Sequence, residues 1–292
     1  MQEPTQESTP RVPYANVHEA VRAYASQWLS WHTTALVIPT LLVAALAGWA
    51  LFAETDPWRS WLQLLWIPAM VGVLVWGYFR AQGIALFYQG IAAAWHWQYA
   101  ASLVPAGYAA TLFSVGHGQI LRNMMGGTVG GARAFIANLE YTVGSGKSAH
   151  TYTNTVAMLA LSDRVPHVLL AVDKDRFDSQ VLSRVRNFEA VPLEGAFEDR
   201  VGLYVQSGFE LEALQIIHVA MLEKLGTTWS KYSLEFVGSE LYVYAPRVLS
   251  TRDEVEELLS LLHYASEELG PRLRHMQGSL RAMREATAAK KV

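Results

Sequence analysis

Two long stretches without a formal charge constrain this chain more than any other feature. No Asp, Glu, Lys or Arg occurs between Ala23 and Ala53, or between Ser60 and Phe79. The first stretch contains ALVIPTLLVAALAGWALFA from residue 35, and the second reads SWLQLLWIPAMVGVLVWGYF. Helices of such length span a hydrocarbon core of about 30 Å and satisfy their own backbone hydrogen bonds there. The pattern predicts a transmembrane helical hairpin over residues 34–80, with a pair of buried core helices as the alternative.

The residues around the hairpin predict its orientation. The linker ETDPWR (54–59) is too short for anything but a tight connection, so both chain ends should lie on one side. Arg59 lies in the linker, whereas Arg11, Arg22 and Arg80 lie on the other side. Positive-inside counting therefore predicts a multi-pass protein of the cell membrane with both termini in the cytoplasm. Residues 1–33 form an N-terminal segment without the basic start of a signal peptide.

Residues 81–121 also contain no formal charge. Ile84, Phe87, Ile91 and Trp95 recur at helical spacing, which favours a membrane-exit helix and linker that pack on the following domain. A third membrane span that includes residues 103–113 (LVPAGYAATLF) is the alternative.

From residue 122 the pattern becomes that of an α+β domain, which we expect to end at residue 270. Alternating residues predict strands over 135–143 and 151–158, and apolar runs predict further strands at 167–172 and 201–205. A hairpin is expected over 232–244, with Gly238-Ser239 as its two-residue turn. Because these strands do not alternate with helices as parallel units would, we expect a mostly antiparallel sheet.

Two amphipathic helices are expected in this domain. The first covers residues 209–225, with Ser207 and Glu210 as a capping box. The second begins at a capping box of Thr251 and Glu254 and ends at Gly270-Pro271. A basic tail follows over 271–292, which contacts anionic lipid or is a solvated end.

Composition excludes some functions. There are no cysteines, so thiolate chemistry and disulfides are excluded. A net charge of -3 gives no reason to expect nucleic acid as a partner. The lipid bilayer is therefore the one partner that the sequence indicates, beside an unknown protein partner.

The segment YTVGSGKS (141–148) resembles the end of a phosphate-binding loop. Such a loop needs a first Gly where this chain has Tyr141, and it joins a strand to a helix. Thr-rich, strand-like sequence follows Ser148 instead. We therefore expect a Gly-rich hairpin turn with Lys147 exposed at its tip, and no nucleotide cofactor.

No metal or catalytic site is predicted. His96, His218 and His263 lack metal-ligand spacing, and the acidic run DKDRFD (173–178) lacks the Gly and Glu of a calcium loop. A Ser-His-Asp arrangement assembled only in the fold stays possible in principle, although no G-x-S-x-G elbow occurs. We name no catalytic, cofactor-binding or metal-binding residue.

Two stretches, 139–161 and 193–246, together with the two N-terminal spans, resemble a bacterial family of membrane-anchored proteins with a C-terminal domain of unknown function. The motif that carries the resemblance in this chain is the Tyr141-x-x-Gly-Ser-Gly-Lys147 hairpin. The resemblance implies a fold and no activity. The leading hypothesis is a non-enzymatic binding or scaffolding domain held at the membrane. The alternatives are a membrane-associated hydrolase or transferase and a nucleotide-binding protein.

Overall fold

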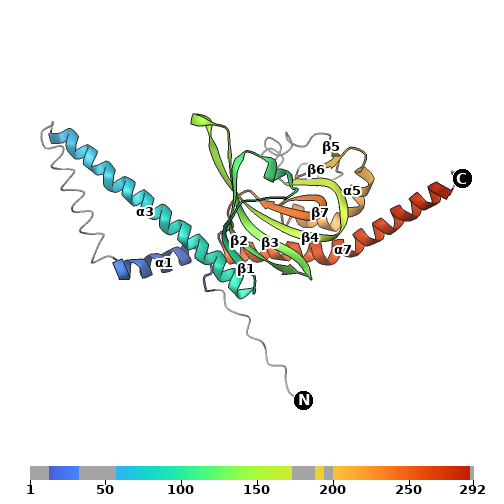
Figure 1. Cartoon of the computed structure of the whole chain (residues 1–292), viewed down its shortest axis with the longest axis horizontal. Helices are drawn as coiled ribbons and strands as arrows, with labels where there is room; N and C mark the ends of the chain where they lie inside the picture. Colours follow the sequence, from blue (N-terminus) through green and yellow to red (C-terminus); the bar gives the residue numbers. More distant parts are fainter. Residues whose placement is uncertain (1–12, 33–56, 173–187, 194–199, 290–292) are drawn as a thin grey trace, which may run out of the picture. The chain divides into compact units, whose positions relative to one another are not determined.

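The computed structural model describes residues 13–32, 57–172, 188–193 and 200–289 (Figure 1). The chain divides into two compact units, residues 1–91 and residues 92–292, which are described separately below. The first expected membrane helix, 35–53, and the acidic run 173–178 lie outside the described residues.

The first unit contains α1 (Val17–His32) and most of α3 (Pro57–Ala94). The side chain of Asn16 caps α1 by accepting from the backbone N–H of Glu19 at 2.9 Å. The two helices approach closely, because a Cβ at Gly83 would lie 2.2 Å from Val21 Cγ2. Hydroxyls of Tyr24 and Tyr78 lie 3.0 Å apart across the same interface.

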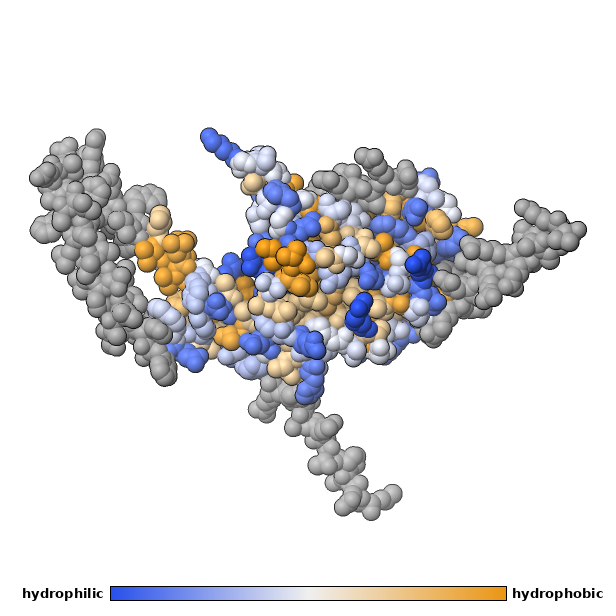
Figure 2. Space-filling model, in the orientation of Figure 1, coloured by the Kyte–Doolittle hydropathy of each residue, from blue (hydrophilic) through white to orange (hydrophobic). Residues whose placement is uncertain are grey.

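One helical segment in the described part of the chain is long and apolar enough to cross a membrane. It covers Met70–Ala94 within α3, with a mean hydropathy of 1.4. Figure 2 shows hydrophobic surface gathered on this part of α3, where Met70, Val73 and Leu74 are each about two thirds exposed or more (65%, 71% and 67%). The described residues thus contain one candidate span, and the expected two-helix hairpin stays a prediction.

The second unit is α+β with a mostly antiparallel sheet, as the sequence predicts, and every strand pair among its described residues is antiparallel. In the part of the unit that the structure describes, seven strands form the sheet in the order β1-β2-β3-β4-β6-β5, with β7 paired to β4. Their bounds are β1 Gln98–Leu103, β2 His117–Val129, β3 Ala132–Val143, β4 His150–Val172, β5 Phe188–Val191, β6 Val201–Gln206 and β7 Ser233–Ala245. The sheet therefore starts before residue 122, inside the range 81–121 that the sequence assigns to a helix and linker. A third membrane span over 103–113 is wrong, since β1 ends at Leu103 and a 3-10 turn (η2, Thr111–Ser114) follows.

The long strand β4 organises the sheet. One of its edges pairs with β3 and, farther along, with β6, while β7 pairs along the other edge. The expected hairpin turn at Gly238-Ser239 is wrong, because β7 runs through it. The register passes from Ala160–Glu240 to Val165–Gly238, so β4 advances five residues while β7 advances two. Gly238 takes φ +61 at this irregularity, which explains its resemblance to a turn glycine.

Beside the strands, the described residues of this unit form the helices α5 (Glu210–Ile216), α6 (Val219–Gly226) and α7 (Arg252–Ala289). The single helix expected over 209–225 is interrupted at Ile217 and His218. Its expected capping box is also wrong, since Ser207 donates to Glu189 and Phe209 is the N-cap. The helix α7 continues past Pro271, so the helix end expected at Gly270-Pro271 is wrong, although an interior proline removes a helical hydrogen bond.

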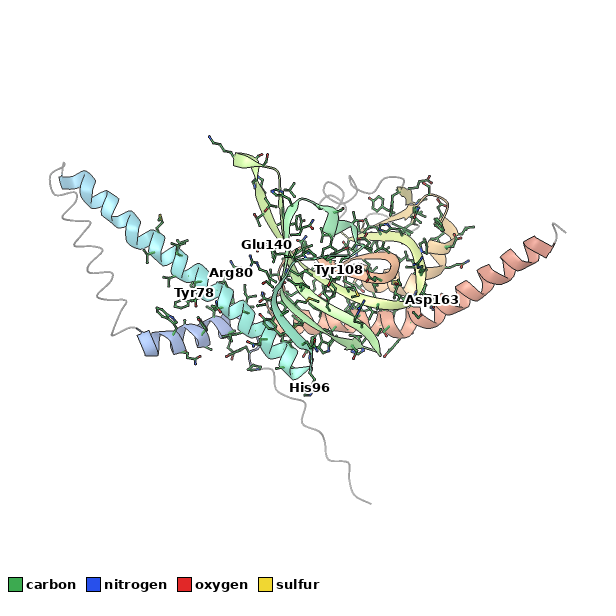
Figure 3. The ribbon with its side chains drawn as sticks, viewed as in Figure 1. Tyr78, Arg80, His96, Tyr108, Glu140 and Asp163 are labelled. Carbon is green, nitrogen blue, oxygen red and sulfur yellow. The ribbon has the colours of Figure 1, made fainter. Side chains whose placement is uncertain are left out.

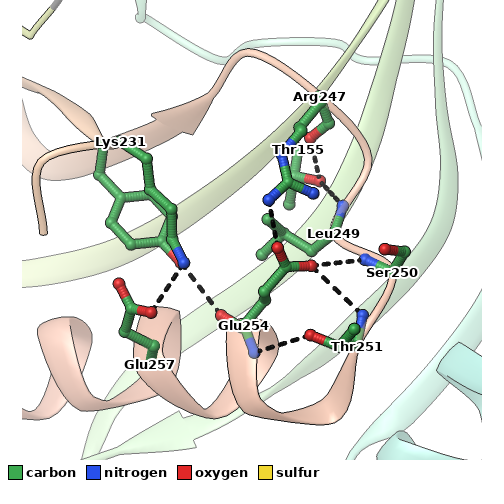
Figure 4. Close-up of polar contacts among 9 residues, drawn as sticks. Thr155, Lys231, Arg247, Leu249, Ser250, Thr251, Glu254 and Glu257 are labelled. Carbon is green, nitrogen blue, oxygen red and sulfur yellow. Dashed lines mark hydrogen bonds and ion pairs between the residues drawn. The ribbon is translucent and has the colours of Figure 1, made fainter. Parts of the chain in front are cut away.

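The capping box expected at the start of α7 is confirmed (Figure 4). The N–H of Glu254 donates to Thr251 Oγ1 at 3.4 Å, and the N–H of Thr251 donates to Glu254 Oε2 at 3.3 Å. Arg247 forms an ion pair with the same carboxylate, and the N–H of Ser250 donates to it. Burial alone would raise the pKa of Glu254, but Arg247 and these backbone donors outweigh it and lower the pKa to about 2.

Different segments pack on the two faces of the sheet. Ile136, Ala157 and Val243 are fully buried on the face against which α7 packs through β4. Residues of opposite parity, including Phe135, Met158 and Tyr242, form a buried cluster on the other face, together with Leu112 and Val115 from the β1–β2 connection. This second face carries the candidate site.

Candidate ligand-binding groove

The connection between β1 and β2, residues 104–116, crosses this second face and is called the strap below. It joins two neighbouring strands, and two of its apolar residues, Leu112 and Val115, are buried. Its middle forms η2, where Thr111 is also buried. Because a loop over a sheet needs partners for its backbone polar groups, its attachment points decide where it lies.

A buried carboxylate, Glu235 of β7, forms the main attachment. Its side chain is 0% exposed. Thr111 donates to Glu235 Oε1 from its N–H at 2.9 Å and from its hydroxyl at 2.6 Å. The phenol of Tyr244 donates to Oε2 at 2.5 Å, and Nε2 of His167 lies 2.6 Å from Oε1. Burial, followed by the charge and hydrogen bond of Glu235, raises the pKa of Tyr244 well above its usual range, so the phenol remains a donor.

Aromatic contacts and a second tyrosine hold the rest of the strap. The rings of Tyr108 and Phe113 stack with centroids 5.0 Å apart, and Tyr108 also contacts Phe135 of β3 at 5.2 Å. Phe113 contacts the ring of Tyr242 at 5.8 Å. The Tyr242 phenol in turn donates to Glu240 Oε2 at 2.5 Å. The strap is therefore fixed at a definite height above the sheet.

A cavity of about 880 Å³ opens beside the strap, between its first part and strands β1 to β4 and β7. We call it the groove. It is lined by Trp95, His96, Trp97, Gln98, Ala106, Gly107, Tyr108, Met124, Gly126, Gly127, Thr128, Arg133, Ala134, Phe135, Met158 and Glu240. Its volume lies within the range typical of small-molecule sites, which combine apolar walls with a few polar groups.

The sheet register explains the floor of the groove. Gly126, Phe135 and Met158 are successive partners across β2, β3 and β4. Gly126 supplies no side chain, and a Cβ there would meet nothing closer than Ala134 O at 4.0 Å. The glycine thus leaves open space over the floor while Phe135 and Met158 make the floor apolar.

Two charged residues flank β4 at one end of this floor. Arg133 is two residues from Phe135 on β3, and Glu240 is two residues from Tyr242 on β7, so both face the groove. Glu240 pairs with Ala160, while Ala134 pairs with Leu159, which places the two charged residues on either side of β4. Burial raises the pKa of Tyr108, Glu240 raises it further and Arg133 lowers it, so the phenol lies within reach of both charges.

Tryptophans form another wall. The rings of Trp95 and Trp97 meet edge to face at 5.5 Å. Trp97 lies against the backbone of Gly127, where an added Cβ would come within 2.4 Å of the indole. His96 between them has φ +55, in the left-handed region, and its side chain is exposed. Figure 3 labels His96 at the end of α3 and Tyr108 over the sheet.

The residues that sequence analysis considered for other sites lie elsewhere, apart from His96. The stretch 141–148 forms the β3–β4 hairpin, with Val143 paired to His150 and Lys147 exposed, as expected. His218 Nε2 lies 2.9 Å from the hydroxyl of Tyr264, and His263 is exposed on α7. Among the described residues no three metal-ligating side chains converge.

Sequence reasoning did not find the groove residues Arg133, Glu240 and Tyr108. Each is an ordinary residue in a strand or connection, and only the register brings them together. The one available signal was the aromatic and glycine content around Trp97 and Gly126-Gly127.

Comparisons with known proteins assign no family. No protein-family model and no curated protein matches the sequence. Among solved structures, the chain is similar to the crystal structure of the mycobacterial trehalose monomycolate transport factor A, TtfA, with a TM-score of 0.48 and 14% sequence identity. The match covers 63% of this chain and 93% of that chain. A likeness of that size carries no argument about function, and the family resemblance described above stays a prediction.

Proposed function

We propose that this protein is a membrane-anchored binding protein whose α+β domain holds a small molecule in the groove. The anchor is the apolar segment of α3, which continues to Ala94 and leads within a few residues to Trp97 of the groove wall. The observation that carries the proposal is the cavity of about 880 Å³ beside a fixed strap, with apolar walls and a charged end.

The described residues of the groove favour binding over catalysis. A catalytic site needs a nucleophile or an acid–base group in contact with another reactive group. In the groove, the carboxylate of Glu240 accepts from Tyr242, and Arg133 is a permanently charged guanidinium. These groups are suited to orienting a ligand by charge and hydrogen bonding.

The experiment compares two substitutions in the full chain. Gly126→Leu places a side chain over the groove floor at a position where an added Cβ meets nothing closer than 4.0 Å, whereas Ala101→Leu adds similar apolar surface to the exposed part of β1 outside the groove. Each protein is transferred from native membranes into a polymer belt, and the small molecules that co-purify are extracted and identified by mass spectrometry.

We expect one class of molecule to be enriched with the unmodified chain and with Ala101→Leu, and to fall at least about tenfold with Gly126→Leu, the equivalent of about 1.4 kcal/mol. Absence of any enriched molecule, or equal enrichment with Gly126→Leu, would contradict the proposal.

A second candidate function, the hydrolase or transferase, is favoured by one observation. His167 of β4 and Glu235 of β7 form the kind of histidine–carboxylate pair that general bases use. Within the described residues, however, Glu235 is the sole hydrogen-bond partner of His167, and the hydroxyls of Thr111 and Tyr244 donate to the same carboxylate and not to the ring. His167 does not line the groove, so this candidate needs a substrate bound elsewhere; if His167 is a general base, His167→Gln abolishes turnover of that substrate by the full chain, whereas a role limited to holding Glu235 leaves any turnover unchanged.

A further inference from the structure

The charged end of the groove indicates what kind of headgroup the ligand carries. Arg133 and Glu240 stand on β3 and β7, with β4 between them, so their backbones are two strand spacings apart, or roughly 10 Å. Neither residue has an ion-pair partner among the described residues, and they form no ion pair with each other.

This spacing leaves room for a bridging molecule. Arg133 is exposed, and the Glu240 carboxylate is held by the Tyr242 phenol through Oε2 alone. Since a carboxylate has about four acceptor positions, Glu240 retains capacity for a donor from the ligand. A single molecule with an anionic group and a donating cation would satisfy both residues at once.

The rest of the groove indicates what the headgroup is attached to. Beyond the charged end, the floor passes over Gly126, Phe135 and Met158, and Tyr108 of the strap closes the wall. No described charge besides Arg133 and Glu240 lines this space. A flexible apolar chain fits such a surface, because methionine and aromatic rings contact it without directional demands.

We propose that the groove binds a single-chain amphiphile with a dipolar headgroup, whose anionic group pairs with Arg133 and whose ammonium group donates to Glu240, while its apolar chain lies over Gly126, Phe135 and Met158. This inference rests on the proposed binding function and adds the chemical class of the ligand. One chain rather than two is inferred because the cavity of about 880 Å³ is the size of a drug-like site.

The test uses the full chain in a polymer belt and four probes with the same chain length. Lysophosphatidylethanolamine carries a phosphate and an ammonium donor. Lysophosphatidylcholine keeps both charges but has no N–H, lysophosphatidic acid is only anionic, and an alkyl maltoside is neutral. Dissociation constants are measured by titration calorimetry below the micellar concentration of each probe.

For the unmodified chain, we expect the ethanolamine headgroup to bind about tenfold more tightly than the choline and anionic headgroups, and the maltoside to bind most weakly. Glu240→Gln should remove the preference for ethanolamine over choline, because its amide still accepts from Tyr242 but carries no charge. Arg133→Gln should weaken the three phosphate probes and leave the maltoside unchanged.

The matched control is Arg122→Gln, which removes an exposed guanidinium of β2 that pairs with Glu140 outside the groove. It should leave all four constants unchanged. Equal binding of all four probes, blocked by Gly126→Leu, would overturn the headgroup assignment and leave the proposed function intact. Binding of none of the probes would overturn this inference, and the co-purification experiment decides the proposed function separately.

Discussion

Replacing Glu235 by Gln should loosen the strap and lower the stability of the domain. The carboxylate is fully buried and accepts from Thr111, Tyr244 and His167 at 2.5 to 2.9 Å. An amide keeps one oxygen but presents an NH₂ donor where Oε2 accepts from Tyr244 and, at 3.1 Å, from the Thr111 N–H. The NH₂ then faces the Thr111 N–H, which can only donate, and the Tyr244 hydroxyl has to turn and accept instead of donating.

The magnitude follows from the kind of bond that is lost. Hydrogen bonds to a charged group contribute about 1.5–3 kcal/mol each, against about 0.5–1.5 kcal/mol for neutral ones. With four donors affected, and with the neutral amide less costly to bury, we expect a loss of about 2–4 kcal/mol. For a domain of this size, that loss lowers the Tm by about 5–15 °C.

The assay is thermal unfolding followed by tryptophan fluorescence, combined with hydrogen exchange at the backbone N–H of Thr111. Glu140→Gln is the control, because Glu140 forms a partly exposed ion pair with Arg122 that should contribute at most about 1 kcal/mol. A Tm for Glu235→Gln within about 2 °C of the unmodified chain, with Thr111 still protected, would refute the attachment described here.

Two further predictions concern close packing and pH. Gly127→Ala should lower the free energy of unfolding by about 1–3 kcal/mol, because its Cβ would lie 2.4 Å from the indole of Trp97. Gly126→Ala should change that free energy by no more than about 0.5 kcal/mol, and chemical unfolding of both variants compares them. The pKa of Glu254 is lowered from 4.5 to about 2 in the folded protein, so its ionised carboxylate stabilises the fold. This contribution is complete above pH 4.5 and is lost as the pH falls from 4.5 toward 2. Glu254→Gln should therefore flatten the fall in unfolding midpoint between about pH 5 and about pH 3, and an unchanged slope would count against the assignment.

The strands with strong periodicity could be predicted from the sequence. The alternating Phe135 to Val143 and the Thr-rich segment after Ser148 fold into β3 and β4, joined by the expected hairpin. Thr251 and Glu254 likewise mark the start of α7. In each case the signal is local, because alternation and capping depend on neighbours only a few residues apart.

The elements that were missed depend on distant contacts. The first strand, QYAASL, contains small residues with weak strand preference, and its pairing with β2 orders it. Gly238 resembles a turn residue, but β7 pairs with β4 on both sides of the irregularity at Gly238, so the strand continues through it. The groove also depends on long-range strand pairing. Arg133 and Glu240 are more than a hundred residues apart in the sequence, and only the pairing of β3 and β7 with β4 brings them to the same end of the groove.

The most direct test of the binding groove places a photoreactive benzoylphenylalanine at position 108 of the full chain in living cells. Tyr108 lies on the strap at the wall of the groove, and its ring contacts Phe135 of the groove floor. After irradiation, mass spectrometry of the peptide that contains residue 108 should show an adduct of one discrete small-molecule mass, absent in the Gly126→Leu background. Crosslinks only to residues of the chain itself, or the same adduct in Gly126→Leu, would contradict the account.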